Sequence, residues 1–338
     1  MKPRYLIALL VVLACTVEQV ATSGPAFDVP APVDGSWLKG NTHAHTTESD
    51  GDSPPDVVAR WYKDHGYDFL VLSDHNAFTD PAWLAALVDS SFLLIPGEEV
   101  TSSFESRPVH VNGLNLPGLV EARSAETLVA TIQANVDAIR EVEGVPHVNH
   151  PNFRWAFGAP ELAQVERYRL LEIFNGHPQV HNEGGGGTDG MEAVWDALLS
   201  QGRRVYGIAV DDAHHFQGEF AHHRSNPGRG WVAVKATGRD PAAIMAALEA
   251  GRFYASSGPT LADVVVTPRR LEVHIAPDGD FRYTTTFIGD GGRVLATSTE
   301  NPAVYELESG VTYVRARVTD SMGYRAWTQP VFVAGSGS

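Results

Sequence analysis

The sequence of 338 residues contains one cysteine, Cys15, and no excess of basic residues. A single cysteine cannot form an intramolecular disulfide, so the folded chain must depend on its hydrophobic core. The 25 lysines and arginines are outnumbered by 41 aspartates and glutamates, which gives a net charge of −16. Such a surface repels phosphate backbones, and no basic run offsets it, so we expect no nucleic-acid partner.

Long apolar runs are also scarce. The run Tyr5–Ala14 follows two basic residues and is too short to span a bilayer as a helix, an order typical of an export signal. Two endings fit the following residues: cleavage after the small residues at 21–23, or lipid attachment at Cys15. We therefore expect residues 1–23 to be a signal peptide or a lipoprotein signal. The mature protein is then periplasmic or extracellular, free or lipid-anchored, with no transmembrane span.

Between residues 37 and 260, short apolar runs alternate with amphipathic segments. Strands are predicted by the apolar runs at 69–72, 92–95, 170–174 and 205–210. Helices are predicted by the apolar spacing at 57–62, 128–139, 191–199 and 241–250. This alternation indicates an α/β fold with a parallel sheet covered by helices. Polar residues follow the strands repeatedly, as at the rim of a (β/α) barrel, where sites form.

The chain changes in character on either side of this region. Residues 24–36 are rich in Pro, Ala, Gly and Asp and are predicted to be a linker. After residue 261, short strands without helical spacing are predicted at 264–266, 271–275, 283–288 and 311–318. We expect residues 261–338 to form a small all-β, sandwich-like domain. It contains one histidine, His274, so the site is expected in residues 37–260.

Most of the 14 histidines lie in short polar clusters at predicted strand ends. In His43-Ala44-His45, both imidazoles would point to one face of a strand, because side chains alternate. The other candidate ligands are Asp50, His75, Glu99, His110, His150, Asp212 and His214. Imidazoles and carboxylates without thiolates suit Zn, Mn or Fe rather than a cysteine-based structural zinc site. The residues alone leave Glu98, His147 and Asp211 as competing neighbours.

The order of these motifs resembles that of the polymerase-and-histidinol-phosphatase (PHP) superfamily, over roughly Trp37–Thr260. The segments 206–215 and 246–259 are similar to the branch that contains carbaryl hydrolase. The resemblance implies a distorted seven-stranded (β/α) barrel that holds up to three divalent metal ions. It also favours Glu99, His150 and Asp212 over their neighbours.

The resemblance further implies which residues hold each ion. The first set is His43, His45, Glu99 and Asp212. The second is Glu99, His110 and His150, with Glu99 bridging. The third is Asp50, His75 and His214. A hydroxide that bridges the metals would attack the substrate, which makes the first set the expected catalytic residues.

Substrate contacts are expected from His177, Arg154 and Arg224. His177 follows a predicted strand, and arginine suits bidentate phosphate contacts. We expect an exported metal-dependent phosphoesterase whose partner is a small phosphate ester. Two alternatives stay open: a carbamate, ester or amide hydrolase with the same metal site, and a non-catalytic exported metal-binding or interaction protein.

Overall fold

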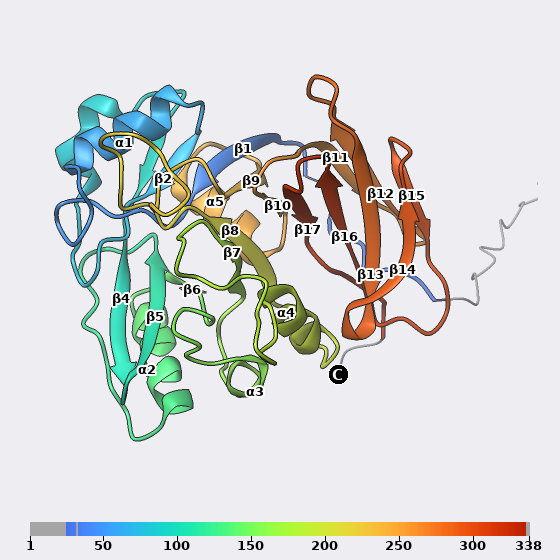
Figure 1. The fold of residues 1–338 in the computed structure, drawn as a ribbon, viewed down its shortest axis with the longest axis horizontal. Coiled ribbons are helices and arrows are strands. Elements are labelled where there is room, and N and C mark those ends of the chain that lie inside the picture. The colour runs from blue at the N-terminus through green and yellow to red at the C-terminus, as the bar shows by residue number, and fades with distance from the viewer. Residues whose placement is uncertain (1–24, 32, 336–338) are drawn as a thin grey trace, which may run out of the picture.

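The computed structural model describes residues 25–31 and 33–335. The expected signal at 1–23, with Cys15, lies outside these residues, so export and lipid anchoring stay predictions. Within the described ranges, no helix has the length and apolar character needed to cross a membrane. The fold is mixed α/β, with an α/β region (blue to yellow) beside a region of strands alone (orange to red) (Figure 1).

The first sheet of the α/β region is built on β1 (Ser36–Asn41). β2 (Phe69–Val71) is its parallel neighbour, followed by β3 (Leu93–Ile95). On its other side β1 pairs antiparallel with β9 (Trp231–Ala236), which runs beside α5 (Pro241–Glu249).

Two helices cover β2 of this sheet. Helix α1 (Pro55–Asp64) begins at a proline suited to the first helical turn and buries Val58, Ala59 and Tyr62. These side chains share one core cluster with Leu84 of the 3₁₀ helix η1 (Pro81–Leu87). Helix α1 thereby covers one face of the sheet at β2.

The second sheet of the α/β region has five strands. They are β4 (Gly97–Phe104), β5 (Arg107–Leu114), β6 (Val145–Val148), β7 (Leu170–Asn175) and β8 (Tyr206–Val210). β4, β5 and β6 pair antiparallel, whereas β6, β7 and β8 are parallel. The accompanying helices are α2 (Leu128–Glu141), α3 (Ala159–Leu162) and α4 (Met191–Leu199).

The expected strands and helices of the α/β region are confirmed, but a closed (β/α) barrel is not. Among the described strands, hydrogen bonding does not form a ring. The hairpin β4–β5, with a two-residue turn at Glu105-Ser106, replaces a strand–helix unit by an antiparallel pair. Short bridges, Ala44–Ala213 and His75–Glu99, still join the two sheets at their ends.

The all-β region consists of two sheets with a common core. One contains β11 (Thr260–Val266), β12 (Arg270–Ala276) and β15 (Ala303–Glu306). The other contains β13 (Tyr283–Gly289), β14 (Arg293–Ser298), β16 (Tyr313–Asp320), β17 (Arg325–Thr328) and β18 (Val331–Phe332), with the 3₁₀ turn η2 (Asp290–Gly292). Leu271 and Val273 pack with Phe287 and Val318, as in a sandwich.

The two regions share one continuous sheet. β17 pairs with β10 (Phe253–Ser256), and β10 pairs with β9. The expected linker also packs here: Phe27 is only 4% exposed and lies in the core of the all-β region. The domain boundary predicted at 260/261 stays a prediction, and hydrogen bonds run across it.

Buried charges also join the two regions. Arg315 of β16 is 1% exposed and bonds both carboxylate oxygens of Asp196 on α4, at 2.7 and 2.6 Å. Its guanidinium also lies 3.0 Å from Glu192, which Arg317 contacts at 3.1 Å. We call Glu192, Asp196, Arg315 and Arg317 the Arg315 cluster. Its two acids and two bases balance.

Candidate metal centre

The structure brings all nine predicted ligands together where the ends of the two sheets meet. They follow β1, β2, β6 and β8 or lie on the hairpin β4–β5: His43, His45, Asp50, His75, Glu99, His110, His150, Asp212 and His214. In sets of three or four, their ligand atoms lie within 4.8 Å of one another. Side chains from six separate segments of the chain therefore meet at one place.

The most compact group contains His43, His45, Glu99 and Asp212. The two Nε2 atoms of the histidines are 3.1 Å apart. Asp212 Oδ1 is 3.5 Å from the first and 3.1 Å from the second, and Glu99 Oε2 is 3.4 Å from both. Ligand atoms about 2.1 Å from one tetrahedral ion lie about 3.4 Å from each other. Five of the six pairs among these four atoms have about that spacing. The implied first set is nevertheless divided, because His43, His45 and Asp212 form one group and Glu99 groups with His43 and His150.

Glu99 is shared between groups. Its Oε1 is 2.9 Å from His110 Nδ1 and 3.3 Å from His150 Nε2, while its Oε2 is 2.9 Å from His75 Nδ1. The implied second set is divided here: His150 groups with Glu99 and His43, and His110 groups with Glu99 and His75. In both, Glu99 holds the bridging position.

The third group surrounds Asp50. Asp50 Oδ1 is 3.2 Å from His214 Nε2, and Oδ2 is 3.7 Å from His75 Nε2. His45 joins this group through its other nitrogen, Nδ1, 3.6 Å from Asp50 Oδ1. The side chain of Asp50 is 56% exposed, whereas that of His45 is buried. This group therefore forms the solvent side of the centre.

A short loop positions Asp50. The carboxylate of Asp74 accepts hydrogen bonds from the backbone N–H and hydroxyl of Thr46 and from the hydroxyl of Ser49, at 2.7–2.8 Å. The Asp74 carboxylate thus fixes a turn, and none of its hydrogen bonds in the described part of the chain goes to an imidazole. A Cβ at Gly51 would lie 2.7 Å from the backbone of His45, so the loop can return this closely only at a glycine.

The electrostatics of the centre favour bound positive charge. Burial raises the pKa of the Glu99 and Asp212 carboxyls, but the surrounding imidazoles outweigh it and hold both well below the usual value. Burial lowers the pKa of His43, but the nearby carboxylates outweigh it and raise it well above the usual value. For His75, Glu99 and Asp50 outweigh burial and raise the pKa to about 9.

The donor set fits divalent cations. Four carboxylates meet here, those of Asp50, Glu99, Glu172 and Asp212, and no lysine or arginine in the described part of the chain forms an ion pair with any of them. Glu99 Oε2 is buried without a hydrogen-bond partner. Buried charges of one sign are costly unless they are paired or bind metal. Nitrogen and oxygen donors suit Zn, Mn or Fe.

The three competing neighbours face elsewhere. Glu98 turns away and accepts a backbone hydrogen bond at 2.7 Å. His147 is buried with neither ring nitrogen hydrogen-bonded, and its Nε2 lies 3.6 Å from Glu172. Asp211 accepts backbone hydrogen bonds from residues 228–230 at 2.6–3.0 Å. The neighbours favoured by the resemblance are the ones that enter the groups.

Sequence analysis missed the residues that hold the ligands in place. Glu172 Oε1 lies 2.6 Å from His43 Nδ1, so in the neutral imidazole that a metal ligand must be, Nδ1 carries the proton and Nε2 directs its lone pair toward the centre. Asn149 and Asn175 donate to Glu99 and Asp212 at 2.8 and 3.1 Å. Glu172 had a detectable signal: a charged residue inside an otherwise apolar strand requires a buried partner.

The expected substrate residues differ in position. The ring of His177 is 5.3 Å from that of His214, so His177 borders the centre without joining a group. Arg154 is exposed and lies over the ring of Phe153, which packs against His150. The Arg224 guanidinium lies 3.4 Å from the carboxylate of Asp52 and also donates to the backbone carbonyl of Glu219. His177 and Arg154 border the centre, whereas Arg224 is committed elsewhere.

Comparison with known proteins adds evidence on the fold. No family model matches the chain. A 5′-3′ exoribonuclease of Haemophilus influenzae is 39% identical over 80 residues, 23% of this chain and 28% of that protein. The match thus spans little more than a quarter of the relative's length.

Solved structures are similar over more of the chain. A two-domain protein from Bacteroides vulgatus that contains a predicted PHP-like metal-dependent phosphoesterase matches with a TM-score of 0.52 at 17% identity, covering 87% of this chain and 93% of that one. A putative metal-dependent phosphoesterase from Bifidobacterium adolescentis has a TM-score of 0.38 at 15% identity over 56% of this chain and 89% of that one. The first likeness shows a shared fold. The similarity to carbaryl hydrolase is not confirmed.

Proposed function

We propose that this protein is a metal-dependent hydrolase of the PHP superfamily that cleaves a small phosphate ester. The observation that carries the proposal is the convergence of nine nitrogen and oxygen ligands, among which the Glu99 carboxylate contacts five histidines. A structural ion needs one closed ligand set, whereas adjoining sets with an exposed side at Asp50 suit a site that substrate can reach.

The shared fold supports this assignment. The Bacteroides vulgatus protein is described as containing a predicted PHP-like metal-dependent phosphoesterase. We infer that the two sheets joined at Ala44–Ala213 and His75–Glu99 are an open form of the superfamily's distorted (β/α) barrel. Export directed by residues 1–23 completes the proposal.

The residues of the metal centre have two roles: some bind the cations, and others orient the metal ligands. Divalent cations held by these residues would lower the pKa of a bound water and neutralise charge that develops on the ester oxygens. Glu172 keeps His43 oriented, while Asn149 and Asn175 fix the Glu99 and Asp212 carboxylates. None of these residues must act as a nucleophile, so the chain needs no covalent intermediate.

Beside the metal centre stands one arginine that has no ion-pair partner among the described residues, Arg154. The described part of the chain provides no ion pair for the exposed side chain of Arg154, which stands over Phe153 next to His150. A guanidinium can bind a phosphate oxygen pair, so Arg154 would hold the ester from outside. His177 would border the other side, next to His214.

The test uses the purified full chain, stripped with a chelator and reloaded with Mn²⁺ or Zn²⁺. It is assayed on p-nitrophenyl phosphate, bis-p-nitrophenyl phosphate and an aryl carbamate, with the stripped protein as control. Metal-dependent release of p-nitrophenol from either phosphate, without carbamate cleavage, supports the proposal. Carbamate cleavage alone would assign the same centre to acyl chemistry. Metal binding without turnover on any ester would leave only a binding function.

A further inference from the structure

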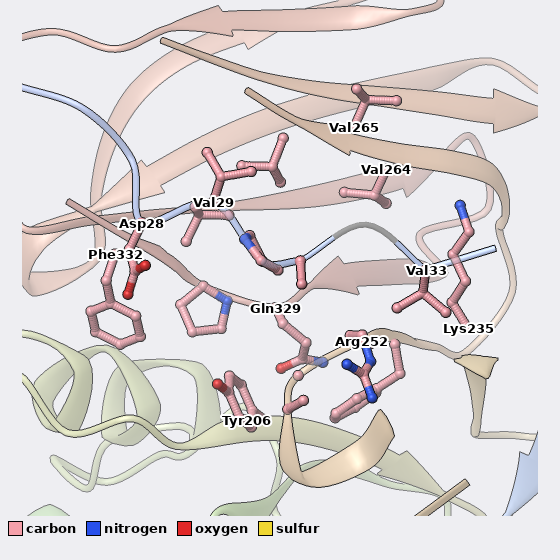
Figure 2. A pocket seen from close by; sticks show the side chains of 18 of the residues that line it. Asp28, Val29, Val33, Tyr206, Lys235, Arg252, Val264, Val265, Gln329 and Phe332 are labelled. Carbon is pink, nitrogen blue, oxygen red and sulfur yellow. The ribbon is translucent and has the colours of Figure 1, made fainter. Parts of the chain in front are cut away.

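A cavity of about 540 Å³ lies at the joint between the two regions and contains none of the metal-centre residues (Figure 2). Its walls come from residues 28–31 and 33, from the β9–β10 side of the α/β region, and from β11 and β18 of the all-β region. This volume is within the range of small-molecule pockets, which occur preferentially at such joints. The cavity therefore has the size and place of a ligand site.

One wall of the cavity is apolar. Val264 and Val266 of β11, Phe332 of β18 and Val29 of the amino-terminal segment line it, and Figure 2 shows the labelled side chains Val29, Val264 and Phe332 around the hollow. Val29 is 38% exposed, and the two β11 valines are only partly buried. Covering this wall with an alkyl chain would remove apolar surface from water.

The cavity also contains three cations, two of which are already paired. Lys235 lies 2.7 Å from Asp263, and Arg204 lies 2.8 Å from Asp28. For the Arg252 guanidinium, the described residues supply neither an ion pair nor a hydrogen bond, and its Nε is buried without a partner. Arg252 is thus the uncommitted charge of the cavity.

The backbone holds Arg252 in this place. Its N–H donates to the carbonyl of Ala247 at the end of α5, and its carbonyl accepts from Lys235 of β9. The neighbouring amide of Gln329 is satisfied, because it both donates to and accepts from the backbone of Gly207. Among the described cations that line the cavity, the guanidinium is therefore the one without an ion-pair partner, and a ligand can bind it directly.

We propose that this cavity binds a monomeric long-chain carboxylate, with its carboxylate on Arg252 and its alkyl chain along the valine wall. A carboxylate matches the two-pronged donor geometry of a guanidinium. An inorganic anion would leave the wall uncovered, and a neutral alkane would leave the guanidinium unpaired. The inference is independent of the proposed function, because the two sites share no residue.

The experiment measures dodecanoate binding to the full chain by titration calorimetry, at concentrations below micelle formation. Trp37 lines the cavity, so its fluorescence provides a second signal, identified by its loss in Trp37→Phe. Arg252→Gln should weaken binding at least about tenfold, because a charge-assisted pair is lost. Arg282→Gln, an exposed arginine outside the cavity, is the matched control and should bind like wild type. Octanoate should bind at least about tenfold more weakly than dodecanoate.

Three results would decide against the proposal. Equal affinity of wild type and Arg252→Gln for dodecanoate, or equal affinity of wild type for dodecanol and dodecanoate, would refute the role of the guanidinium. Absence of dodecanoate binding to wild type would refute the site. Circular dichroism checks that Arg252→Gln is folded. Val29→Asp, on the half-exposed segment, tests the wall separately and should also weaken binding at least about tenfold.

Discussion

The metal centre and the Arg315 cluster both bury several charged side chains, but they balance charge differently. In the Arg315 cluster, two arginines face two carboxylates, and Asp196 and Arg315 bond through two parallel contacts. In the metal centre, the carboxylates receive hydrogen bonds from Asn149 and Asn175, but the ionisable partners that the described residues give them are all imidazoles. Three polar atoms of the Arg315 cluster are buried without a hydrogen-bond partner in the described part of the chain: Arg315 Nη1, Arg317 Nε and Glu192 Oε2. The contrast therefore lies in charge: the first group pairs its carboxylates with guanidiniums of the chain, whereas the second has no guanidinium or ammonium partner among the described residues.

This difference separates a structural from a functional use of buried charge. Burying an ion pair costs desolvation that good geometry can offset, and the Arg315 cluster offsets it within the protein. The metal centre leaves its carboxylates in excess, which is the arrangement expected where ions bind and chemistry follows. Its supporting residues, Glu172, Asn149 and Asn175, orient the ligands but do not neutralise them.

The largest effect is expected from breaking the balanced cluster. Asp196→Ala leaves the 1% exposed Arg315 without its closest partner and should lower the free energy of unfolding by about 3–5 kcal/mol. Urea unfolding of the metal-loaded protein measures this. Asp280→Ala, an exposed aspartate, is the control. The double variant Asp196→Leu with Arg315→Met should recover most of the loss, and metal content should not change in any of these variants.

In the metal centre, removing a carboxylate should affect metal binding and activity rather than the stability of the fold. Glu99→Gln removes the shared carboxylate charge and should abolish stable metal loading and at least about 100-fold of hydrolase activity, with the fold retained. Glu98→Gln is the matched control, because the adjacent Glu98 turns to a backbone N–H outside the centre. Elemental analysis and initial rates measure both variants. Full metal content in Glu99→Gln would contradict the ligand assignment.

A smaller effect is expected one step away from the ligands. Glu172→Gln keeps the size of the side chain but weakens its hold on the proton at His43 Nδ1, so Nε2 is less firmly directed toward the centre. Metal affinity should fall about 10- to 100-fold, measured by competition with a metal-binding dye. Activity at saturating metal should recover toward wild type. A loss of activity that excess metal does not restore would instead give Glu172 a direct role.

The sequence predicted those parts of the molecule in which local pattern determines structure. Mostly apolar segments such as Leu170–Asn175 and amphipathic segments such as Leu128–Glu141 form the expected elements. The hairpin β4–β5 was missed, because Thr101-Ser102-Ser103 interrupts its apolar pattern. The pairing of β10 with β17 was not predictable, since strand partners about 70 residues apart leave no local periodicity.

For the candidate site, the residue types of the ligands and their order along the chain could be predicted. The residues that orient the ligands, and the way in which the ligands divide into groups, could not. Histidines and carboxylates at strand ends pointed to one edge, and the structure brings them together. The role of Asp74 in fixing the Thr46 loop depends on three-dimensional proximity. The two ring nitrogens of His45 contact different carboxylates, Nδ1 that of Asp50 and Nε2 that of Glu99, and residue spacing does not predict this double contact.

The smallest effect is expected at the outer edge of the Arg315 cluster. The side chain of Arg317 is 30% exposed, so Arg317→Gln should cost no more than about 1 kcal/mol at pH 7. Burial alone would raise the pKa of Glu192, but the charges of Arg315 and Arg317 outweigh burial and lower this pKa below its usual value. The ionised Glu192 therefore stabilises the fold fully above its unfolded pKa, and this stabilisation is lost as the pH falls through the folded pKa. The gap between variant and wild type, followed by urea unfolding, should therefore shrink from about pH 4.5 downward. A gap that stays constant down to pH 3 would show that Arg317 acts through packing rather than charge, and the balance attributed to the cluster would then rest on Asp196 and Arg315 alone.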